Sequence, residues 1–324
     1  MSNYDVLCVG SATVDTFLTV EQPLSALKLG DKVLVKSVNK RSGGGATNSA
    51  AALAKLGLKV KTATKVGNDE DGSFILRELR AEEIENITLS RSKQQTDLAT
   101  IISSTKEKDR IILVHKGAST DLSGNDLPVS KMNCSWIYLA TLTGKSMHTA
   151  QQIAAIARKR KIKLLFNPSL YLAQKGVKSL SNILSNTTVL VLNKEEAQAL
   201  LKSFSHDFKF LLRELQKSGP ETVIVTNGRK GLYALHGNIF YSLTKTPNVR
   251  IVHTAGAGDA FTAGFLAGLI KKYSFEDALR LGQVNASSVI QHLGAKVGQL
   301  NEKEAKAMIR KYQIQITVKN AGRS

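Results

Sequence analysis

Short apolar runs alternate with amphipathic stretches along most of the chain. Apolar runs bounded by polar or glycine positions predict buried strands at 6–10, 59–65, 136–140, 163–166, 188–192, 222–226 and 250–252, and a hairpin at 232–235 and 239–243. Apolar residues at helical spacing predict helices at 48–56, 149–158, 194–201, 260–270 and 275–292. This alternation is typical of an α/β fold, in which a doubly wound, mostly parallel sheet is flanked by helices on both faces.

Two stretches break the alternation. Residues 13–20 with 31–38, and 96–104 with 110–115, are β-branched and alternating, and no helical pattern separates the members of either pair. They predict antiparallel strands outside the main sheet, as a small β lid inserted at about 13–38 and 96–115. The chain has no Pro/Ser-rich linker and no internal repeat. We therefore expect residues 1–324 to form one domain that carries this lid.

Composition narrows the class of protein. The chain has 324 residues, of which 42% are apolar, as in ordinary globular proteins. No apolar run reaches the roughly 18–20 residues that cross a bilayer, and the first residues lack the pattern of a signal peptide. Cys8 and Cys134 both lie in strand-like apolar runs, so a disulfide framework is not expected. These features predict a cytoplasmic protein without a membrane partner.

The formal net charge of +19 raises the question of nucleic-acid binding, because a basic surface attracts polyanions. The Lys and Arg residues are, however, spread along the chain. Their densest cluster, at 158–163, falls at the end of a predicted helix, where cations complement the helix dipole and face water. Aromatic residues are sparse and do not interleave with the basic ones. This distribution argues against a nucleic-acid partner.

The segment 254–259, Thr-Ala-Gly-Ala-Gly-Asp, is the strongest chemical signal, because it places a glycine turn and an acid before an apolar helix. Small residues let successive N–H groups converge on one point, and the helix adds its free N–H groups and positive dipole end. This combination predicts an anion hole with Asp259 at its edge. An acid at such a place can take a proton from an alcohol while a phosphoryl group arrives. The alternative interpretation is an ordinary strand-to-helix turn.

Two polar signals near the N-terminus suit the binding of a polyol. Three successive glycines at 43–45 let the backbone approach a ligand, and Asn48 can donate to and accept from hydroxyl groups. The alternative is that Asn48 caps the following helix. Asp15, near the end of a strand, could accept hydrogen bonds from two adjacent hydroxyls, or it could be an exposed strand-end acid.

Two further signals follow apolar strands in the second half of the chain. Asn193 and Glu196 could form a capping box, or they could face a triphosphate and its hydrated Mg²⁺. Thr226 is followed by Gly228 and Gly231, which allow either an ordinary hairpin turn or a loop that wraps a nucleotide. The spacing of a Walker A loop is absent. Because open α/β sheets bind ligands at the carboxyl ends of their strands, we expect all of these signals to share one site.

Together and in this order, the motifs at 43–48, 66–72, 193–196, 226–231 and 254–259 make the chain resemble the ribokinase-like carbohydrate kinase family of the phosphofructokinase-B type. The resemblance covers nearly the whole length. It implies a ribokinase-like fold and the transfer of the γ-phosphoryl group of ATP to a hydroxyl group of a small sugar. It also implies that the lid covers the acceptor, and that a homodimer can form through the lid, as it often does in relatives.

The resemblance also assigns roles to residues of this chain. It makes Asp259 the general base, with the backbone N–H groups of Gly256, Ala257 and Gly258 around the phosphoryl group. The acceptor is held by Asp15, Gly43, Gly44 and Asn48. The ATP side is formed by Asn193, Thr226, Gly228 and Gly231, with Lys230 and Gln283 near the nucleotide. Glu196 serves Mg²⁺ through water.

Two departures from the family pattern bear on ligands. His253 stands where relatives often carry an Asp that helps bind a monovalent cation, which argues against a role for K⁺. Thr13 stands where an Asn is often found, which argues against ribose as the acceptor.

The acceptor itself stays open between a hexose, a sugar acid, a sugar phosphate and a nucleoside. A nucleoside kinase is the alternative on the same fold, although sparse aromatics favour a simple sugar or sugar acid. A phosphorylated acceptor would require basic side chains, for which the candidates are Lys36, Lys40, Arg41 and Arg110. A non-catalytic sugar-binding or nucleic-acid-binding protein is a further alternative, against which Asp259 and Glu196 argue.

Overall fold

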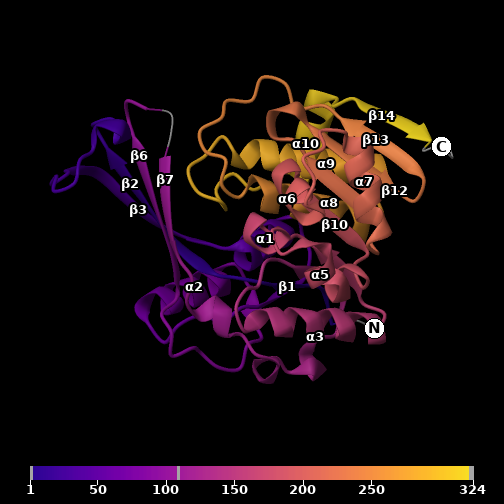
Figure 1. The fold of residues 1–324 in the computed structure, drawn as a ribbon, viewed down its shortest axis with the longest axis horizontal. Coiled ribbons are helices and arrows are strands. Elements are labelled where there is room, and N and C mark those ends of the chain that lie inside the picture. Colours follow the sequence, from indigo (N-terminus) through magenta and orange to yellow (C-terminus); the bar gives the residue numbers. More distant parts are fainter. Residues whose placement is uncertain (1–2, 108–109, 321–324) are drawn as a thin grey trace.

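The computed structural model describes residues 3–107 and 110–320, and it contains a large sheet between two layers of helices (Figure 1). The strands of this sheet are β1 (Tyr4–Val9), β4 (Val60–Ala63), β5 (Glu85–Asn86), β8 (Cys134–Leu139), β9 (Lys163–Phe166), β10 (Val189–Asn193), β11 (Thr222–Thr226), β12 (Leu232–His236), β13 (Ile239–Leu243) and β14 (Ile316–Asn320). Their order is β14-β13-β12-β11-β10-β9-β8-β1-β4-β5. Neighbours from β11 to β5 are parallel, whereas β11 to β14 pair antiparallel.

Helices cover both faces because the buried strands are apolar on both sides. In β1, Val6 and Cys8 belong to one hydrophobic core, and Leu7 and Val9 belong to the other. The first core is closed by α1 (Gly45–Lys55), α2 (Glu70–Ala81), α8 (Ala257–Ile270), α9 (Phe275–Val289) and α10 (Glu302–Tyr312). The second is closed by α3 (Ser146–Lys159), α4 (Leu170–Ala173), α5 (Gly176–Leu184), α6 (Lys194–Leu201) and α7 (Phe208–Lys217). The predicted fold class is thus confirmed.

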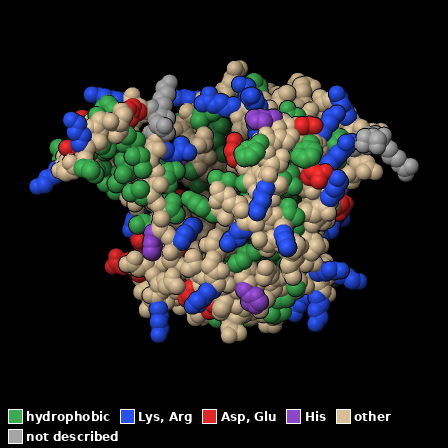
Figure 2. Space-filling view, viewed as in Figure 1, with side chains coloured by type: hydrophobic (Ala, Val, Ile, Leu, Met, Phe, Trp, Pro, Cys, Tyr) green, Lys and Arg blue, Asp and Glu red, His purple; other side chains and the backbone are tan. Residues whose placement is uncertain are grey.

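The predicted lid is a separate sheet that projects from the body (Figure 1). It consists of β2 (Thr13–Val20), β3 (Val35–Gly43), β6 (Asp97–Ser104) and β7 (Arg110–His115), in the order β3-β2-β6-β7. Each hairpin is antiparallel, as expected. The two hairpins are joined by β2 and β6, which run parallel to each other over their full length. Figure 2 shows a hollow between this lid and the body.

Two predicted strands need correction. The strand expected at 31–38 is β3, which starts at Val35 and runs through Gly43, because Asp31 closes a turn with Lys28 instead of pairing with β2. The strand expected at 250–252 is absent, since the backbone N–H groups of Val252 and His253 both donate to the carbonyl of Ile290 rather than to a strand. The segment is therefore held by the end of α9.

Two expectations about composition can be compared with the structure. Among the described residues, no helix combines the length and apolar character needed to cross a membrane. Cys8 and Cys134 are buried and free, as expected from the absence of a disulfide framework.

Candidate active site

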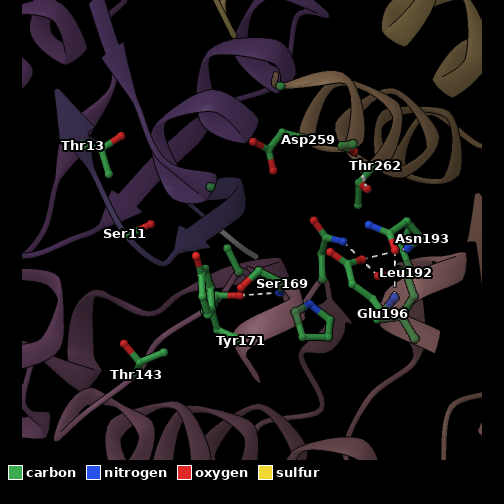
Figure 3. A pocket seen from close by; sticks show the side chains of 18 of the residues that line it. Ser11, Thr13, Thr143, Ser169, Tyr171, Leu192, Asn193, Glu196, Asp259 and Thr262 are labelled. Atoms are coloured by element: carbon green, nitrogen blue, oxygen red, sulfur yellow. Dashed lines mark hydrogen bonds between the residues drawn. The ribbon is translucent and has the colours of Figure 1, made fainter. Parts of the chain in front are cut away.

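A cavity of about 640 Å³ lies at the carboxyl ends of the parallel strands (Figure 3). Its wall includes Asn193 and Thr226, the last residues of β10 and β11, and Gly256, Gly258 and Asp259 around the start of α8. In the close-up view, Ser11 and Thr13 lie on one side of Asp259, and Asn193 and Glu196 lie on the other. Residues from the two ends of the chain therefore meet in one cavity, with Asp259 between them. The predicted acceptor residues Asp15, Gly43, Gly44 and Asn48 are not among the residues that line it.

The turn before α8 depends on Gly256. Its φ is +77°, and a Cβ at this position would lie 2.6 Å from the Cα of Ala295. Only glycine combines this backbone conformation with such a close approach. The N–H of Ala257 donates a 3.3 Å hydrogen bond to the carbonyl of Thr254. An anion bound by this amide would have to replace that bond, whereas Gly256 and Gly258 directly line the cavity.

Asp259 has the electrostatic environment of a general base. One carboxylate oxygen accepts a 2.9 Å hydrogen bond from Nδ2 of Asn48, which fixes its orientation. Burial is the largest cause that raises the pKa of Asp259 to about 6, and the negative charge of Asp15 adds to it. The hydrogen bond from Asn48 acts in the opposite direction. A carboxylate with this pKa is ionised at neutral pH and takes up a proton more readily than an ordinary Asp.

Asn48 lies inside α1, not at its cap. The helix starts at Gly45 with Gly44 in the N-cap position, so the alternative interpretation of Asn48 as a capping residue is wrong. The side chain is buried, with the residue 5% exposed, and its Oδ1 has no hydrogen-bond partner among the described residues. An unpartnered buried acceptor next to Asp259 is suited to receive a hydroxyl group of a ligand.

Asp15 and the glycine turn before α1 lie against each other. A Cβ on Gly43 would collide with the Asp15 carboxylate, and Gly44 has a φ of +94° and lies against the backbone of Ser11. Asp15 accepts a 2.9 Å hydrogen bond from the Thr13 hydroxyl. Burial raises its pKa, and Thr13 together with two lysines opposes that shift. Asp15 is thus half-buried, not the exposed strand-end acid of the alternative interpretation.

On the other side of Asp259, Asn193 and Glu196 form the predicted capping box. Asn193 Oδ1 accepts from the N–H of Glu196, and Glu196 Oε2 accepts from the N–H of Asn193, both at 2.8 Å. Both residues also line the cavity. Burial raises the pKa of Glu196 to about 7, and Asp259 adds to that shift. The structural interpretation of this motif is therefore confirmed, and both side chains also lie at the cavity, where the functional interpretation requires them.

The other predicted nucleotide residues lie farther out. Thr226 lines the cavity, whereas Gly228, Lys230 and Gly231 form the turn after it and do not. Gly231 is a structural requirement, because its φ is +95° and a Cβ at this position would lie 2.0 Å from the carbonyl oxygen of Leu243. Gln283 lies on α9 outside the cavity wall, and its side chain donates to the hydroxyl of Ser287.

Several residues of the cavity wall were assigned no role from the sequence. The floor consists largely of hydroxyl and amide groups from Ser11, Thr141, Thr143, Asn167, Ser169 and Tyr171. Asn167 is oriented by two bonds, because its Oδ1 accepts from the Tyr138 hydroxyl at 3.0 Å and its Nδ2 donates to Val191. The signal for Asn167 was its place directly after a buried strand. The single hydroxyl residues carry no motif that would reveal them.

The described part of the cavity wall offers few protein ligands for a metal ion. Within residues 3–107 and 110–320, no group of three or more His, Cys, Asp or Glu side chains could hold a metal ion. Glu196 is a single carboxylate at the cavity wall, and one of its oxygens serves the capping box. This donor set fits a Mg²⁺ ion that keeps most of its waters and binds substrate phosphates, as Mg²⁺ commonly does.

Comparison with known proteins places this chain in a family. A family model described as pfkB family carbohydrate kinase matches residues 3–302. An uncharacterized sugar kinase of Archaeoglobus fulgidus is 29% identical over 76% of this chain and 97% of its own length.

Two solved structures share the fold. A ribokinase from Thermotoga maritima has a TM-score of 0.82 and 22% identity, covering 95% of this chain and 99% of the other. A nucleoside kinase of Methanocaldococcus jannaschii has a TM-score of 0.79 and 22% identity, covering 96% of this chain and 99% of the other. At this identity, they support the fold and not the substrate.

Proposed function

Since the chain belongs to the pfkB family of carbohydrate kinases, which transfer a phosphoryl group to an alcohol, we propose that it moves the γ-phosphoryl group of ATP to a hydroxyl group of a small carbohydrate. The observation that supports this mechanism most directly is Asp259, with its raised pKa, next to the Gly256 turn in one cavity. We further propose that residues 1–324 act as one catalytic domain with an inserted lid, in the reducing cytoplasm that two free thiols suit.

The reaction follows from the position of Asp259 in the middle of the cavity. Asp259 removes the proton from the acceptor hydroxyl, whose oxygen attacks the γ-phosphorus while the bond to the β-phosphate oxygen breaks and ADP leaves. Backbone N–H groups of Gly256, Ala257 and Gly258 stabilise the charge on the transferring group. The proton ends on the Asp259 carboxylate, whose raised pKa favours its protonation.

The two sides of the cavity divide the substrates. Asp15, Gly43, Gly44 and Asn48 hold the acceptor next to Ser11 and Thr13. Asn193 and Thr226 contact the phosphate chain, and Gly228, Lys230, Gly231 and Gln283 lie farther along the path of the nucleotide. Glu196 would hold Mg²⁺ through water, and the ion would neutralise phosphate charge. In support of this division, Ser11 and Thr13 lie on one side of Asp259, and Asn193 and Glu196 lie on the other (Figure 3).

Formation of ADP from ATP tests the proposal. We expect it to depend on a carbohydrate acceptor and to yield one phosphorylated product per ADP. Nucleosides form a second arm of the panel, because Ala99 and Val114 of the lid give the cavity an apolar wall that a base could contact. Turnover of nucleosides alone would favour that alternative. ATP binding without turnover of any acceptor would contradict the proposed function.

His253 leads to a prediction about monovalent cations. The ring is buried against Phe17, its Nδ1 accepts a 3.2 Å hydrogen bond from the N–H of Ala255, and burial lowers its pKa. A neutral ring in this position does not supply the negative charge that would attract a cation. We expect dialysed enzyme to show the same rate, within about twofold, with and without K⁺. A strong activation on adding K⁺ would refute this expectation.

A homodimer through the lid is a separate proposal. The face of the lid turned away from the cavity exposes Val38 of β3 and Ile111 and Leu113 of β7. Figure 2 shows hydrophobic side chains gathered on the lid. Exposed apolar patches often mark interfaces between proteins. We expect sedimentation velocity to show a dimer that Leu113→Asp converts to a monomer; a native monomer at micromolar concentration would exclude it.

A further inference from the structure

We propose that the carbohydrate phosphorylated here carries a negatively charged group, a phosphate or a carboxylate, and that Lys116 recognises it. The inference rests on the proposed kinase function and narrows its acceptor. Lys116 is a cation of the cavity wall, where it stands with Thr13, Ala99 and Val114 on the acceptor side. No motif contains Lys116, so local sequence could not single it out.

The register of the lid explains why Lys116 faces the cavity. Side chains alternate along a strand, so residues of one parity share a face. Phe17 of β2 contacts His253 of the body, and it lies in register with Ile101 and Ile112, which defines the inner face of the lid. Val114 belongs to this face, and Lys116 follows two residues later.

Lys116 lies at the cavity wall, and its ammonium group pairs with one carboxylate. Its Nζ lies 3.3 Å from Oδ2 of Asp97, which is fully buried, while the Lys116 side chain is 37% exposed. Asp97 already accepts hydrogen bonds from the N–H of Gly117 at 3.0 Å, the N–H of Ser119 at 3.0 Å and the hydroxyl of Ser119 at 2.5 Å. Asp97 thus holds the ammonium end of Lys116 in place, while it shares its negative charge with three other hydrogen-bond donors.

Two further cations lie on the same face of the lid. Arg41 pairs in register with Asp15, and its side chain lies next to Gly294 in the loop after α9. Arg110 donates a 3.1 Å hydrogen bond to the hydroxyl of Thr254, at the start of the anion-hole turn. Both arginines thus lie next to residues of the body, and a hollow lies between the lid and the body in Figure 2.

The other two basic candidates from the sequence lie on the opposite face. Lys40 pairs with Asp71 of α2 at 2.6 Å, and Lys36 pairs with Glu21 at 2.9 Å. The lid therefore presents Arg41, Arg110 and Lys116 towards the cavity, against the carboxylates of Asp15 and Asp97. A neutral sugar would give Lys116 no charged partner besides Asp97, whereas a phosphate or carboxylate next to it would add a second one.

Pairs of neutral and negatively charged acceptors provide the test. The kcat/KM with ATP is measured for fructose against fructose 6-phosphate, and for glucose against gluconate, in the native enzyme and in Lys116→Met. We expect the native enzyme to prefer one charged partner at least about 10-fold, and Lys116→Met to lower kcat/KM for that partner by about 10- to 100-fold, mainly through KM. The neutral acceptors should change by less than about threefold. A preference for fructose 6-phosphate would identify the recognised group as a phosphate, and a preference for gluconate would identify it as a carboxylate.

Control variants separate recognition from folding. Lys40→Met removes the same charge from the outer face of the lid and should leave both acceptor classes unchanged. Lys116→Arg should restore much of the activity on the charged acceptor. A native preference for neutral sugars, or an equal loss on neutral and charged acceptors in Lys116→Met, overturns the inference while the kinase function stands. Failure to phosphorylate any carbohydrate would contradict the proposed function itself.

Discussion

Replacing Asp259 by Asn should lower kcat by at least about 100-fold, with little change in the Kd for ATP. The amide keeps the shape of the side chain and its contact with Asn48, but it cannot accept the proton of the acceptor hydroxyl. Because the carboxylate contacts the moving proton and not the resting nucleotide, binding of ATP should survive. Steady-state kinetics with ATP titrations followed by calorimetry measure both quantities, and near-native turnover would remove the proposed mechanism.

The same variant should be at least as stable as the native protein. Burial raises the pKa of Asp259 from 3.8 to about 6, so the ionised carboxylate is disfavoured in the folded state. The ionised carboxylate therefore destabilises the folded state. This destabilisation is absent below the pKa of Asp259 in the unfolded chain and complete above its pKa in the folded state, so it is present at pH 7. A neutral amide removes that cost. Thermal unfolding at pH 7 and pH 4 checks the sign: the stability gain of Asp259→Asn should be larger at pH 7.

Replacing Gly256 by Ala should reduce both activity and stability. A Cβ would lie 2.6 Å from Cα of Ala295 and 2.7 Å from its carbonyl oxygen, and φ is +77°. Left-handed backbone and overpacking each cost roughly 1–3 kcal/mol, so the free energy of unfolding should fall by about 2–5 kcal/mol. If the turn moves to relieve the contact, its N–H groups no longer point at the transferring phosphoryl group, and kcat should fall by about 10²–10³-fold.

Gly237→Ala is the matched control for this change. Gly237 also has a left-handed φ, +54°, but a Cβ there meets no atom within 4 Å, and the residue lies in the turn between β12 and β13. Gly237→Ala should lower the free energy of unfolding only by the cost of the left-handed backbone, about 1 kcal/mol, and should leave kcat unchanged. Equal destabilisation in the two variants would show that the contact with Ala295 contributes nothing.

Local pattern predicted the parallel core because the strands are apolar on both faces and carry clear boundaries. The local pattern led to wrong predictions where contacts between distant parts of the chain determine the structure. The segment 250–252 has strand-like residues, but Val252 and His253 bond to Ile290 at the end of α9, a partner that no local pattern reveals. The helix at Glu302–Tyr312 was overlooked although its signal was present, since Asn301 and Glu304 form a capping box.

In the candidate site, too, some residues could be predicted from local sequence and others could not. Asp259, Asn193 and Glu196 stand in motifs with fixed spacing, so their positions at the cavity followed from the sequence. Lys116 and Tyr138 stand in ordinary strand contexts. Their contribution depends on the register of β7 against β6 and on the packing beneath Asp259, which are set by residues far away in the chain.

The parallel pairing of β2 and β6 has a consequence for the order of folding. A parallel pair cannot be closed by a tight turn, and here the intervening chain contains α1, β4, α2 and β5. The entropy of closing so long a loop favours prior ordering of that intervening chain. We therefore expect the body to fold first and catalytic competence to appear only in the last kinetic phase, when the second hairpin docks beside the first.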